Sequence, residues 1–475
     1  MPVASATAED QHGGVIGSRV AAALGALTLV LAGCTGTPVE HERVPVVVDT
    51  DMGQDDAMAL LFLLQDQAVR VEAITVSGTG LAHCDAGVRN VLGLLEVANA
   101  PDDLPVACGP DEPLPGTSEV AGAFPDEWRA ASDGFYGVDL PDSDRKPAEQ
   151  PGPQLIATSI GGADEPVRLL TLGPLTNVAL ALRAEPDLVD DIERIVIMGG
   201  AVGVPGNAIE NPLAEFNVWV DPVAAQEVLG SGAPIDLVPL DATNDVPVTP
   251  FFADALRRHH VTAEAGVVRS LFDALSLDAG GYFFWDPLAA AITVDRSLAT
   301  FEDRRIGVLE GKPTIQGWTV NEGDGARIHV ATGADALEFE RTFLDTLNGD
   351  HAVEAMRPEP VATASLWPSG CTWDGPSRLP AGLAAVGLDA APNATRVLAV
   401  VRLLDGHTPE DLDTWLAALD YVVHRRTPAW ITPAAFFDAT SGTLGALQLA
   451  AGPHVVVCGD QAGRVEIVDA FDVAA

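Results

Sequence analysis

The chain has 475 residues, of which 26 are Lys or Arg and 68 are Asp or Glu, so its formal net charge is −42. Nucleic-acid binding needs clustered basic charge, so this balance excludes a nucleic-acid partner and a basic membrane-binding patch. Only Lys146 and Lys312 are lysines, which leaves few candidates for a Schiff-base or phosphate-binding lysine. An apolar fraction of 47% with 20% charged residues is typical of a globular protein.

Residues 20–32 (VAAALGALTLVLA) form an apolar run that is too short for a permanent membrane span but has the length of a signal-peptide core. The run leads into Leu31-Ala32-Gly33-Cys34, which resembles the lipobox of bacterial lipoproteins. Residues 1–34 are therefore predicted to be a lipoprotein signal peptide. We expect export and a lipid anchor on Cys34 at the outer face of the cytoplasmic membrane; the alternative is a plain secretory signal.

Four further cysteines, Cys84, Cys108, Cys371 and Cys458, would meet an oxidising environment after export. The spacing favours a Cys371–Cys458 disulfide, because both residues lie in the C-terminal segment. Cys84 and Cys108 either pair or remain buried thiols. No C-x-x-C motif or Cys/His cluster occurs, so a zinc site is not expected.

From Val44 onward, short β-branched runs alternate with amphipathic stretches. Expected strands cover 44–49, 71–77, 167–172, 195–198 and 235–240, and expected helices cover 55–67, 86–99, 175–183 and 222–229. Apolar strands separated by helices predict an α/β fold with a mostly parallel, Rossmann-like sheet flanked by helices. Such sheets bind ligands beyond the carboxyl ends of their strands.

The pattern changes beyond about residue 350. We expect the α/β domain to span 44–350, a Pro- and Ala-rich linker to span 351–364, and a small β-rich domain of unknown function to span 365–475. Within that last part, strands are predicted at 395–403 and 454–458 and a helix at 409–419.

The turn after the first strand carries four carboxylates. Asp49 and Asp51 end an apolar strand, Gly53 permits a tight turn, and Asp55 and Asp56 open an apolar helix. Carboxylates so close together repel one another unless a cation lies among them. Oxygen ligands without His or Cys suit Ca²⁺ or Mg²⁺. The alternative is a solvated helix-capping loop.

Residues 49–56 (DTDMGQDD) resemble the N-terminal signature of the inosine-uridine-preferring nucleoside hydrolases. Further motifs follow in the family's order: 172–177 (LGPLTN), 198–200 (MGG), 214–217 (AEFN) with 221–222 (DP), and 285–289 (WDPLA). The resemblance covers about residues 44–348 and implies the nucleoside hydrolase fold. It also implies hydrolysis of a small ribonucleoside to ribose and free base. Because relatives are usually dimers or tetramers, a homo-oligomer is a further expectation.

The resemblance assigns roles residue by residue. The Ca²⁺ ligands fall on Asp51, Asp56, the backbone carbonyl of Leu172 and Asp286, and Asp51 would also act as general base toward the metal-bound water. The substrate-binding residues are Asp55 at the 2- and 3-hydroxyls, Asn217 at the 3-hydroxyl, Glu215 and Asn207 at the 5-hydroxyl, and Met198 and Trp285. Asn211 rivals Asn207, because the stretch before Glu215 is longer than usual.

Trp285 stands where many family members have a histidine that protonates the departing base. The purine-preferring branch has tryptophan there, stacked on the base, so Trp285 predicts purine nucleosides as substrates. Trp128 and Tyr136 could form the other side of the base site. The alternative is that Trp285 only packs beneath the metal site.

A second departure lies in the loop at 77–83. Much of the family has an asparagine near the position of Thr79, where it supports the ribose and the metal. Either His83 and Asp85 substitute for this side chain, or the loop is reshaped.

Three other functions compete with the hydrolase. Asp49-Thr50-Asp51 superficially fits an Asp-x-Asp phosphohydrolase, but neither lysine follows a core strand as that chemistry requires. A surface lipoprotein could bind nucleosides without hydrolysing them. Finally, the C-terminal domain could define an adhesion or wall-binding protein, to which the α/β domain is accessory.

Overall fold

The computed structural model describes residues 43–115, 124–310, 314–321, 325–349, 359–391, 393–417, 428–437, 444–460 and 464–474. The predicted signal peptide and Cys34 lie outside these residues, as do positions 351–358 of the predicted linker. The described residues form an α/β part up to 349 and a β-rich part from 359, and the hydrophobic clusters of the two parts share no residue. None of the described helices is long and apolar enough to cross a membrane.

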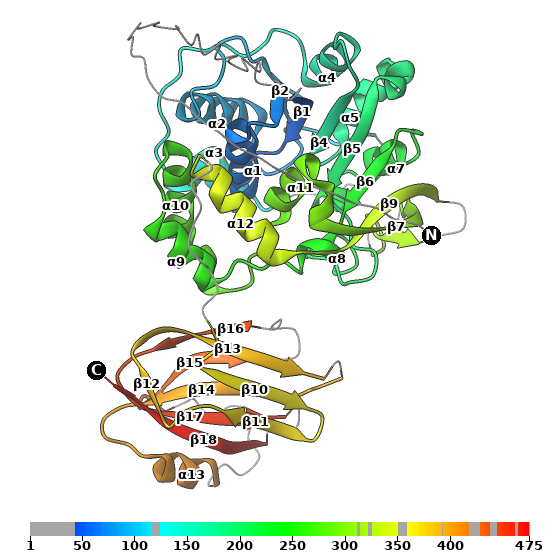
Figure 1. Cartoon of the computed structure of the whole chain (residues 1–475). Coiled ribbons are helices and arrows are strands. Elements are labelled where there is room, and N and C mark those ends of the chain that lie inside the picture. Colours follow the sequence, from blue (N-terminus) through cyan, green and yellow to red (C-terminus); the bar gives the residue numbers. More distant parts are fainter. Residues whose placement is uncertain are drawn as a thin grey trace, which may run out of the picture. The chain divides into compact units, whose positions relative to one another are not determined.

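The α/β part contains a nine-stranded sheet with the order β3-β2-β1-β4-β5-β6-β9-β7-β8 (Figure 1). Its strands are β1 (Val44–Thr50), β2 (Val69–Val76), β3 (Val106–Cys108), β4 (Val167–Thr171), β5 (Ile192–Met198), β6 (Ile235–Val238), β7 (Ala299–Val308), β8 (Thr319–Asn321) and β9 (Ala326–Ala334). Pairing is parallel from β3 to β9, and antiparallel where β7 joins β9 and β8. The predicted mostly parallel α/β fold is confirmed, whereas the antiparallel edge was not predicted.

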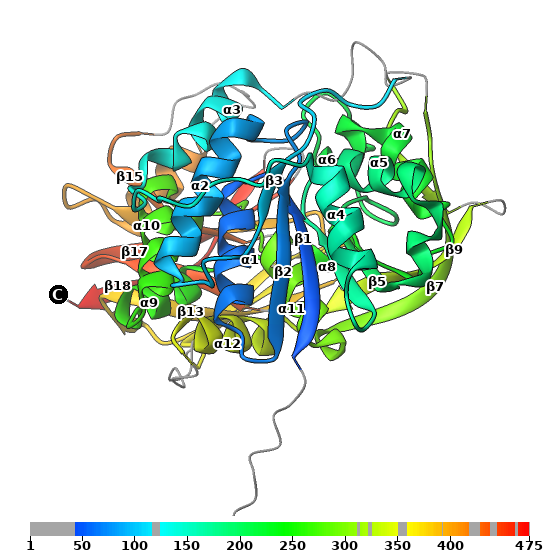
Figure 2. The same cartoon turned by 90° about the horizontal axis from the view of Figure 1, so that it is seen from above.

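Helices cover both faces of this sheet, as Figure 2 shows for α1 and α2 on one side of β1 and β2 and for α4 and α5 on the other. The helices are α1 (Gln54–Gln65), α2 (Cys84–Val97), α3 (Asp126–Asp133), α4 (Gly152–Gly161), α5 (Thr176–Ala184), α6 (Phe216–Val220), α7 (Pro222–Leu229), α8 (Leu240–Thr243), α9 (Pro250–Arg258), α10 (Ala263–Leu275), α11 (Trp285–Val294) and α12 (Ala336–Leu347). Short 3-10 turns lie at Phe135–Gly137, Pro186–Asp190, Leu277–Ala279 and Arg296–Leu298.

The two faces divide the residues of each central strand between two cores. In β1, Val46 and Val48 belong to the core under α1, α2 and α9 to α12, while Val47 belongs to the core under α4, α5 and α7. Successive side chains of a strand point to opposite faces, so a strand covered on both sides must be apolar at every position. This double burial explains the continuous apolar runs of the sequence.

The β-rich part contains two sheets, with the orders β11-β10-β13-β16 and β12-β18-β17-β14-β15. Its elements are β10 (Ala362–Trp367), β11 (Gly370–Asp374), β12 (Arg378–Pro380), β13 (Gly382–Ala390), β14 (Val397–Leu403), α13 (Pro409–Ala417), β15 (Ile431–Phe437), β16 (Leu444–Leu449), β17 (Gly452–Gly459) and β18 (Val465–Ala474). β10 thus begins inside the range predicted as linker. Residues of both sheets, among them Leu366 and Val456, form one core.

Two disulfides occur among the described residues. The predicted Cys371–Cys458 bond is confirmed and joins β11 to β17, with the two Cα atoms 5.8 Å apart. Cys84 and Cys108, for which pairing was left open, also form a disulfide, with their Cα atoms 5.5 Å apart. This second bond ties the first residue of α2 to the last residue of β3.

Candidate active site

The turn between β1 and α1 is built around the carboxylate of Asp56. The backbone N–H of Asp51 donates to its Oδ1 at 3.0 Å, the N–H of Gly53 donates to its Oδ2 at 2.8 Å, and the Thr50 hydroxyl also donates to Oδ1. Met52, between them, has a left-handed φ of 59°. Asp56 therefore closes the turn and caps the helix, which holds its carboxylate in one orientation.

Glycines enclose the side chain of Asp51. A Cβ atom on Gly80 would lie 2.2 Å from the Asp51 side chain, and one on Gly173 would lie 2.6 Å from it. The backbone N–H of Leu81 donates to Asp51 Oδ2 at 3.1 Å. Asp51 is only 2% exposed, and its side chain is enclosed by the backbone at Gly80 and Gly173, with one backbone N–H on its carboxylate.

The carboxylates converge without a basic partner. Ligand atoms of Asp55, Asp56 and Asp286 lie within 4.8 Å of one another, and Asp51 lines the same pocket. Burial, reinforced by the neighbouring negative charges, raises the pKa of Asp51 and Asp286 well above the usual value and that of Asp55 to about 8. Among the described residues, the pocket lining contains no Lys or Arg. Four buried oxygen donors of one charge fit a hard divalent cation.

Asn217 connects this cluster to the middle of the pocket. Its Nδ2 donates to the backbone carbonyls of Leu172 at 2.9 Å and Met198 at 3.3 Å. Because both amide hydrogens point toward these oxygens, its Oδ1 remains as an acceptor. Leu172 is the predicted carbonyl ligand, and a carbonyl oxygen with a second lone pair can still coordinate a cation.

Glu215 lies at the start of α6 and acts as its N-cap. Its Oε1 accepts the backbone N–H of Asn217 at 2.9 Å, and its Oε2 accepts those of Gly200 at 3.0 Å and Val218 at 3.2 Å. Burial raises the pKa of Glu215 despite these three bonds. The backbone thus orients a buried carboxylate that also lines the pocket.

The two rival asparagines differ in position. Asn207 lines the pocket, and its Oδ1 accepts the backbone N–H of Phe216 at 3.0 Å, which leaves its amide donor free to bind a ligand. Asn211 is 2% exposed, donates to the Gln316 carbonyl at 2.8 Å and is not part of the lining. Of the two, Asn207 is therefore placed to contact a substrate.

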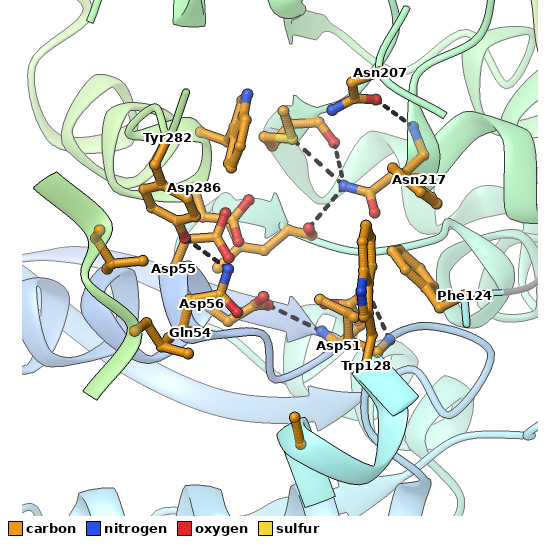
Figure 3. Close-up of a pocket in the computed structure, with 18 of the residues that line it drawn as sticks. Asp51, Gln54, Asp55, Asp56, Phe124, Trp128, Asn207, Asn217, Tyr282 and Asp286 are labelled. Carbon is orange, nitrogen blue, oxygen red and sulfur yellow. Dashed lines mark hydrogen bonds between the residues drawn. The ribbon is translucent and has the colours of Figure 1, made fainter. Parts of the chain in front are cut away.

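The carboxylates, Asn207 and Asn217 line one pocket of about 560 Å³. It is lined by every residue predicted to act in the site, namely Asp51, Asp55, Asp56, Leu172, Met198, Asn207, Glu215, Asn217, Trp285 and Asp286. Figure 3 shows the four aspartates and the two asparagines around this common space. Asp49 is buried beneath it, where it accepts bonds from Thr75 at 2.5 Å and Asn177 at 2.7 Å. The positions agree with the predicted roles, and the roles themselves stay predictions.

Aromatic side chains form the rest of the lining. Trp285 packs edge to face on Tyr282 with ring centroids 4.8 Å apart. A second group contains Phe124 stacked on Phe216 at 4.8 Å, with Trp128 tilted against Phe216 at 5.5 Å. Tyr136 lines the pocket as well. Such surfaces suit the flat, partly apolar ring of a nucleobase.

Sequence reasoning missed Gln54 and Tyr282. Gln54 Nε2 donates to the Tyr282 hydroxyl at 2.9 Å, and both residues line the pocket together with Asp55. Gln54 stands inside the aspartate motif and could have been singled out there. Tyr282 precedes the motif of Trp285, and no sequence signal pointed to it.

The polar side chains of the loop at 77–83 do not line the pocket. The Thr79 hydroxyl is 2.8 Å from the Ser77 hydroxyl and 3.1 Å from that of Thr176, and Thr79 does not line the pocket. His83 Nδ1 lies 2.7 Å from Asp133 instead. His83 and Asp85 are exposed and absent from the lining. The hypothesis that they replace the missing asparagine is therefore wrong, because their side chains point elsewhere.

The fold and the pocket together define an α/β protein with an acidic, partly aromatic site for a small polar ligand, and comparison with known proteins specifies the class. Residues 46–341 match the family described as inosine-uridine preferring nucleoside hydrolase. The pyrimidine-specific ribonucleoside hydrolases RihA of Klebsiella pneumoniae (strain 342) and of Enterobacter sp. (strain 638) are both 36% identical over 284 residues. These matches cover 58% of this chain and 88% and 87% of the relatives. The chain belongs to this family and is a nucleoside N-ribohydrolase.

Solved structures of the same class resemble the α/β part. The purine-preferring ribonucleoside hydrolase from Gardnerella vaginalis is 26% identical with a TM-score of 0.55, and covers 64% of this chain and 98% of its own. An inosine-guanosine nucleoside hydrolase is 27% identical with a TM-score of 0.57, and the match covers 64% of this chain and 99% of that protein. The β-rich part lies beyond the end of the family match at residue 341.

Proposed function

We propose that this nucleoside hydrolase cleaves the N-glycosidic bond of purine ribonucleosides in a Ca²⁺-dependent reaction with Asp51 as general base. The observation that carries the proposal is the single pocket in which four buried carboxylates, uncompensated by any basic residue of the described lining, adjoin hydroxyl-binding groups and aromatic rings.

The donor set of the pocket supports a resident cation. Asp51, Asp56, Asp286 and the carbonyl of Leu172 would hold it. When bound, a divalent cation offsets the repulsion among these carboxylates and lowers the pKa of a neighbouring water molecule.

The side chains of the pocket then have separate roles in the reaction. Asp51, held by the Leu81 N–H, takes the proton of the attacking water. Asp55 and the Oδ1 of Asn217 accept hydrogen bonds from ribose hydroxyls. The negative charge of the cluster stabilises the oxocarbenium-like sugar as the base departs. Because these acceptors would be unpaired without a sugar hydroxyl, 2-deoxyribosides are poor substrates.

The proposed purine preference rests on Trp285. The described lining contains no histidine, so no imidazole is placed to protonate the departing base. An indole stacked on a purine favours the protonated, cationic ring, and solvent can then supply the proton. The relatives differ on this point, since the 36% identical proteins are named pyrimidine-specific and the Gardnerella protein purine-preferring.

Ribose release from inosine, guanosine, adenosine, uridine and cytidine, with and without a chelator, tests the proposal. We expect turnover of the three purine nucleosides to exceed that of the pyrimidines, and chelation to abolish it until Ca²⁺ is restored. Faster uridine hydrolysis would overturn the purine preference alone. Calorimetric binding of every nucleoside without ribose release would overturn the catalytic role in favour of nucleoside binding.

We further propose that the enzyme works outside the cytoplasmic membrane, anchored through Cys34. The lipobox-like segment supports this location, and so do two disulfides, which are typical of exported proteins. Replacing Cys34 with alanine should move the protein from the membrane fraction to the soluble fraction. Unchanged fractionation of the variant would exclude the lipid anchor.

A further inference from the structure

The loop at 77–83 determines where the carboxylate of Asp51 points. Besides the Leu81 N–H on Oδ2, the Ala82 N–H donates to the Asp51 carbonyl at 2.9 Å. Gly80 lies so close that no side chain would fit between the loop and Asp51. A displacement of this loop would therefore move the hydrogen bond that orients Asp51.

No polar side chain of this loop lines the pocket to support Asp51 from within. Leu81 lines the pocket but is apolar, and Thr79 is 3% exposed with its hydroxyl bonded to Ser77 and Thr176. The backbone amide of Leu81 is thus the polar group that the loop presents to Asp51. Something outside the loop must hold that amide in place.

Helix α3 supplies this support. Arg129 Nη2 donates to the carbonyl of Gly78 at 2.6 Å and lies 3.5 Å from that of Ala82. One guanidinium therefore links the two ends of the segment that contains Gly80 and Leu81. Asp133 accepts the backbone N–H of His83 at 2.8 Å.

The same helix also contacts the other side of the catalytic turn. The Ser132 hydroxyl donates to the carbonyl of Met52, the residue after Asp51, at 2.7 Å. Asn90 Nδ2 in turn donates to the Ser132 carbonyl at 3.0 Å and fixes α3 to α2. The helix therefore binds the chain both after Asp51 and around the amide that orients it.

We propose that Arg129 is a positioning residue for Asp51. It holds the backbone between Gly78 and Ala82 in place, so that the Leu81 N–H remains hydrogen-bonded to the Asp51 carboxylate. This inference rests on the proposed role of Asp51 as base and metal ligand. A guanidinium bonded to two carbonyls makes charge-assisted hydrogen bonds, which hold geometry more firmly than neutral ones. Misplacing a catalytic group by about 1 Å costs roughly a hundredfold in rate.

The test compares Arg129→Met with Arg129→Lys and with Arg183→Met in the full-length protein. Arg183 is an exposed arginine paired with Glu227 and serves as the matched control. We expect Arg129→Met to lower kcat about a hundredfold while KM for inosine changes little. Arg129→Lys should recover part of the loss, because an ammonium can still donate to one carbonyl. Arg183→Met should match the wild type.

Ca²⁺ binding by calorimetry gives a readout that does not need turnover. Displacing Asp51 should weaken Ca²⁺ binding about tenfold in Arg129→Met, whereas Arg183→Met should bind as the wild type does. Wild-type kcat and Ca²⁺ affinity in Arg129→Met would overturn the inference. A rise in KM without a fall in kcat would also overturn it, because it would indicate that α3 acts on the base site through Trp128. If Arg129→Met does not fold, Arg129→Gln takes its place, and wild-type kcat and Ca²⁺ affinity in that variant would overturn the inference equally. A wild type that binds Ca²⁺ but releases no ribose would refute the proposed function, while weaker Ca²⁺ binding in the variant would still support the positioning.

Discussion

Asp51 combines full burial with a single backbone donor on its carboxylate, which suits a group that must accept a proton. Asparagine has nearly the same shape but cannot take up that proton, so we expect Asp51→Asn to lower kcat by at least about a hundredfold. Burial and the neighbouring carboxylates raise the pKa of Asp51, so removing its charge should also leave the metal-free protein at least as stable as before. Ribose release and thermal unfolding in a chelator measure the two effects.

The matched control for this substitution is Asp111→Asn. Asp111 is exposed and accepts the backbone N–H of Cys84 at 3.2 Å, outside the pocket lining. Near-normal turnover in Asp51→Asn would exclude Asp51 as the base. A folded but inactive Asp111 variant would show that the assay responds to any lost carboxylate near this edge of the sheet.

Trp285 makes the base preference testable at a single side chain. Aromatic stacking on a base contributes about 1–3 kcal/mol, so Trp285→Ala should lower kcat/KM for inosine by roughly tenfold or more. The effect on uridine should be smaller, because a pyrimidine offers less area and no imidazole ring to protonate. Steady-state kinetics on both substrates decides the point. An equal loss on both would assign Trp285 to packing beside Tyr282 instead of stacking.

The Cys84–Cys108 disulfide joins α2 to β3, and Cys84 immediately follows the loop at 77–83 in sequence. The bonded cysteines are separated by 24 positions in sequence, and closing a loop of this length restricts the unfolded chain by about 3 kcal/mol. We expect the Cys84→Ala/Cys108→Ala variant to lose a comparable free energy of unfolding in the α/β part, measured by denaturant titration.

The second disulfide provides the comparison. Replacing Cys371 and Cys458 should leave the α/β transition unchanged, because that bond lies within the β-rich part. If both double variants shift the same transition, the two parts unfold as one unit, and the expectation of separate transitions is wrong.

Whether a strand could be predicted from the sequence depends on how the fold buries it. Strands covered on both faces, such as β1, read as unbroken apolar runs, and the aspartates directly after β1 had to lie at its carboxyl end. Near the antiparallel end of the sheet, β7 is exposed or half-buried at its first seven positions and β9 mixes buried with exposed positions, so neither strand appears in the sequence as an apolar run. Arg129 and Tyr282 reach the site through contacts between elements far apart in sequence, which a one-dimensional pattern does not contain.

The α/β part and the β-rich part have separate hydrophobic cores, and each contains buried titratable groups whose pKa values are shifted by burial. In the α/β part, burial raises the pKa of Asp49 to about 7 and that of Asp55 to about 8. A carboxyl group whose folded pKa is raised stabilises the fold below its ordinary value near 3.8 and loses this contribution as pH rises toward the folded value. Without Ca²⁺, the α/β part should therefore become less stable between pH 5 and pH 8.

In the β-rich part, His454 is 1% exposed and stacks on Phe471 with ring centroids 5.4 Å apart. Burial lowers its pKa below the ordinary 6.5. For a histidine with a lowered folded pKa, the contribution to stability is intact above pH 6.5 and is lost as pH falls, because the unfolded chain protonates first. Acid should therefore destabilise this part while it stabilises the other.

Calorimetry of the metal-free protein between pH 5 and pH 8 should then show two unfolding transitions that move in opposite directions. His454→Phe keeps an aromatic ring against Phe471 and removes the titrating group, so it should abolish the acid shift of the β-rich transition alone. Ca²⁺ should raise the α/β transition more at pH 8 than at pH 5, because the ligand carboxylates must be ionised to bind it. A single transition, or two that shift together with pH, would contradict the independence of the two cores.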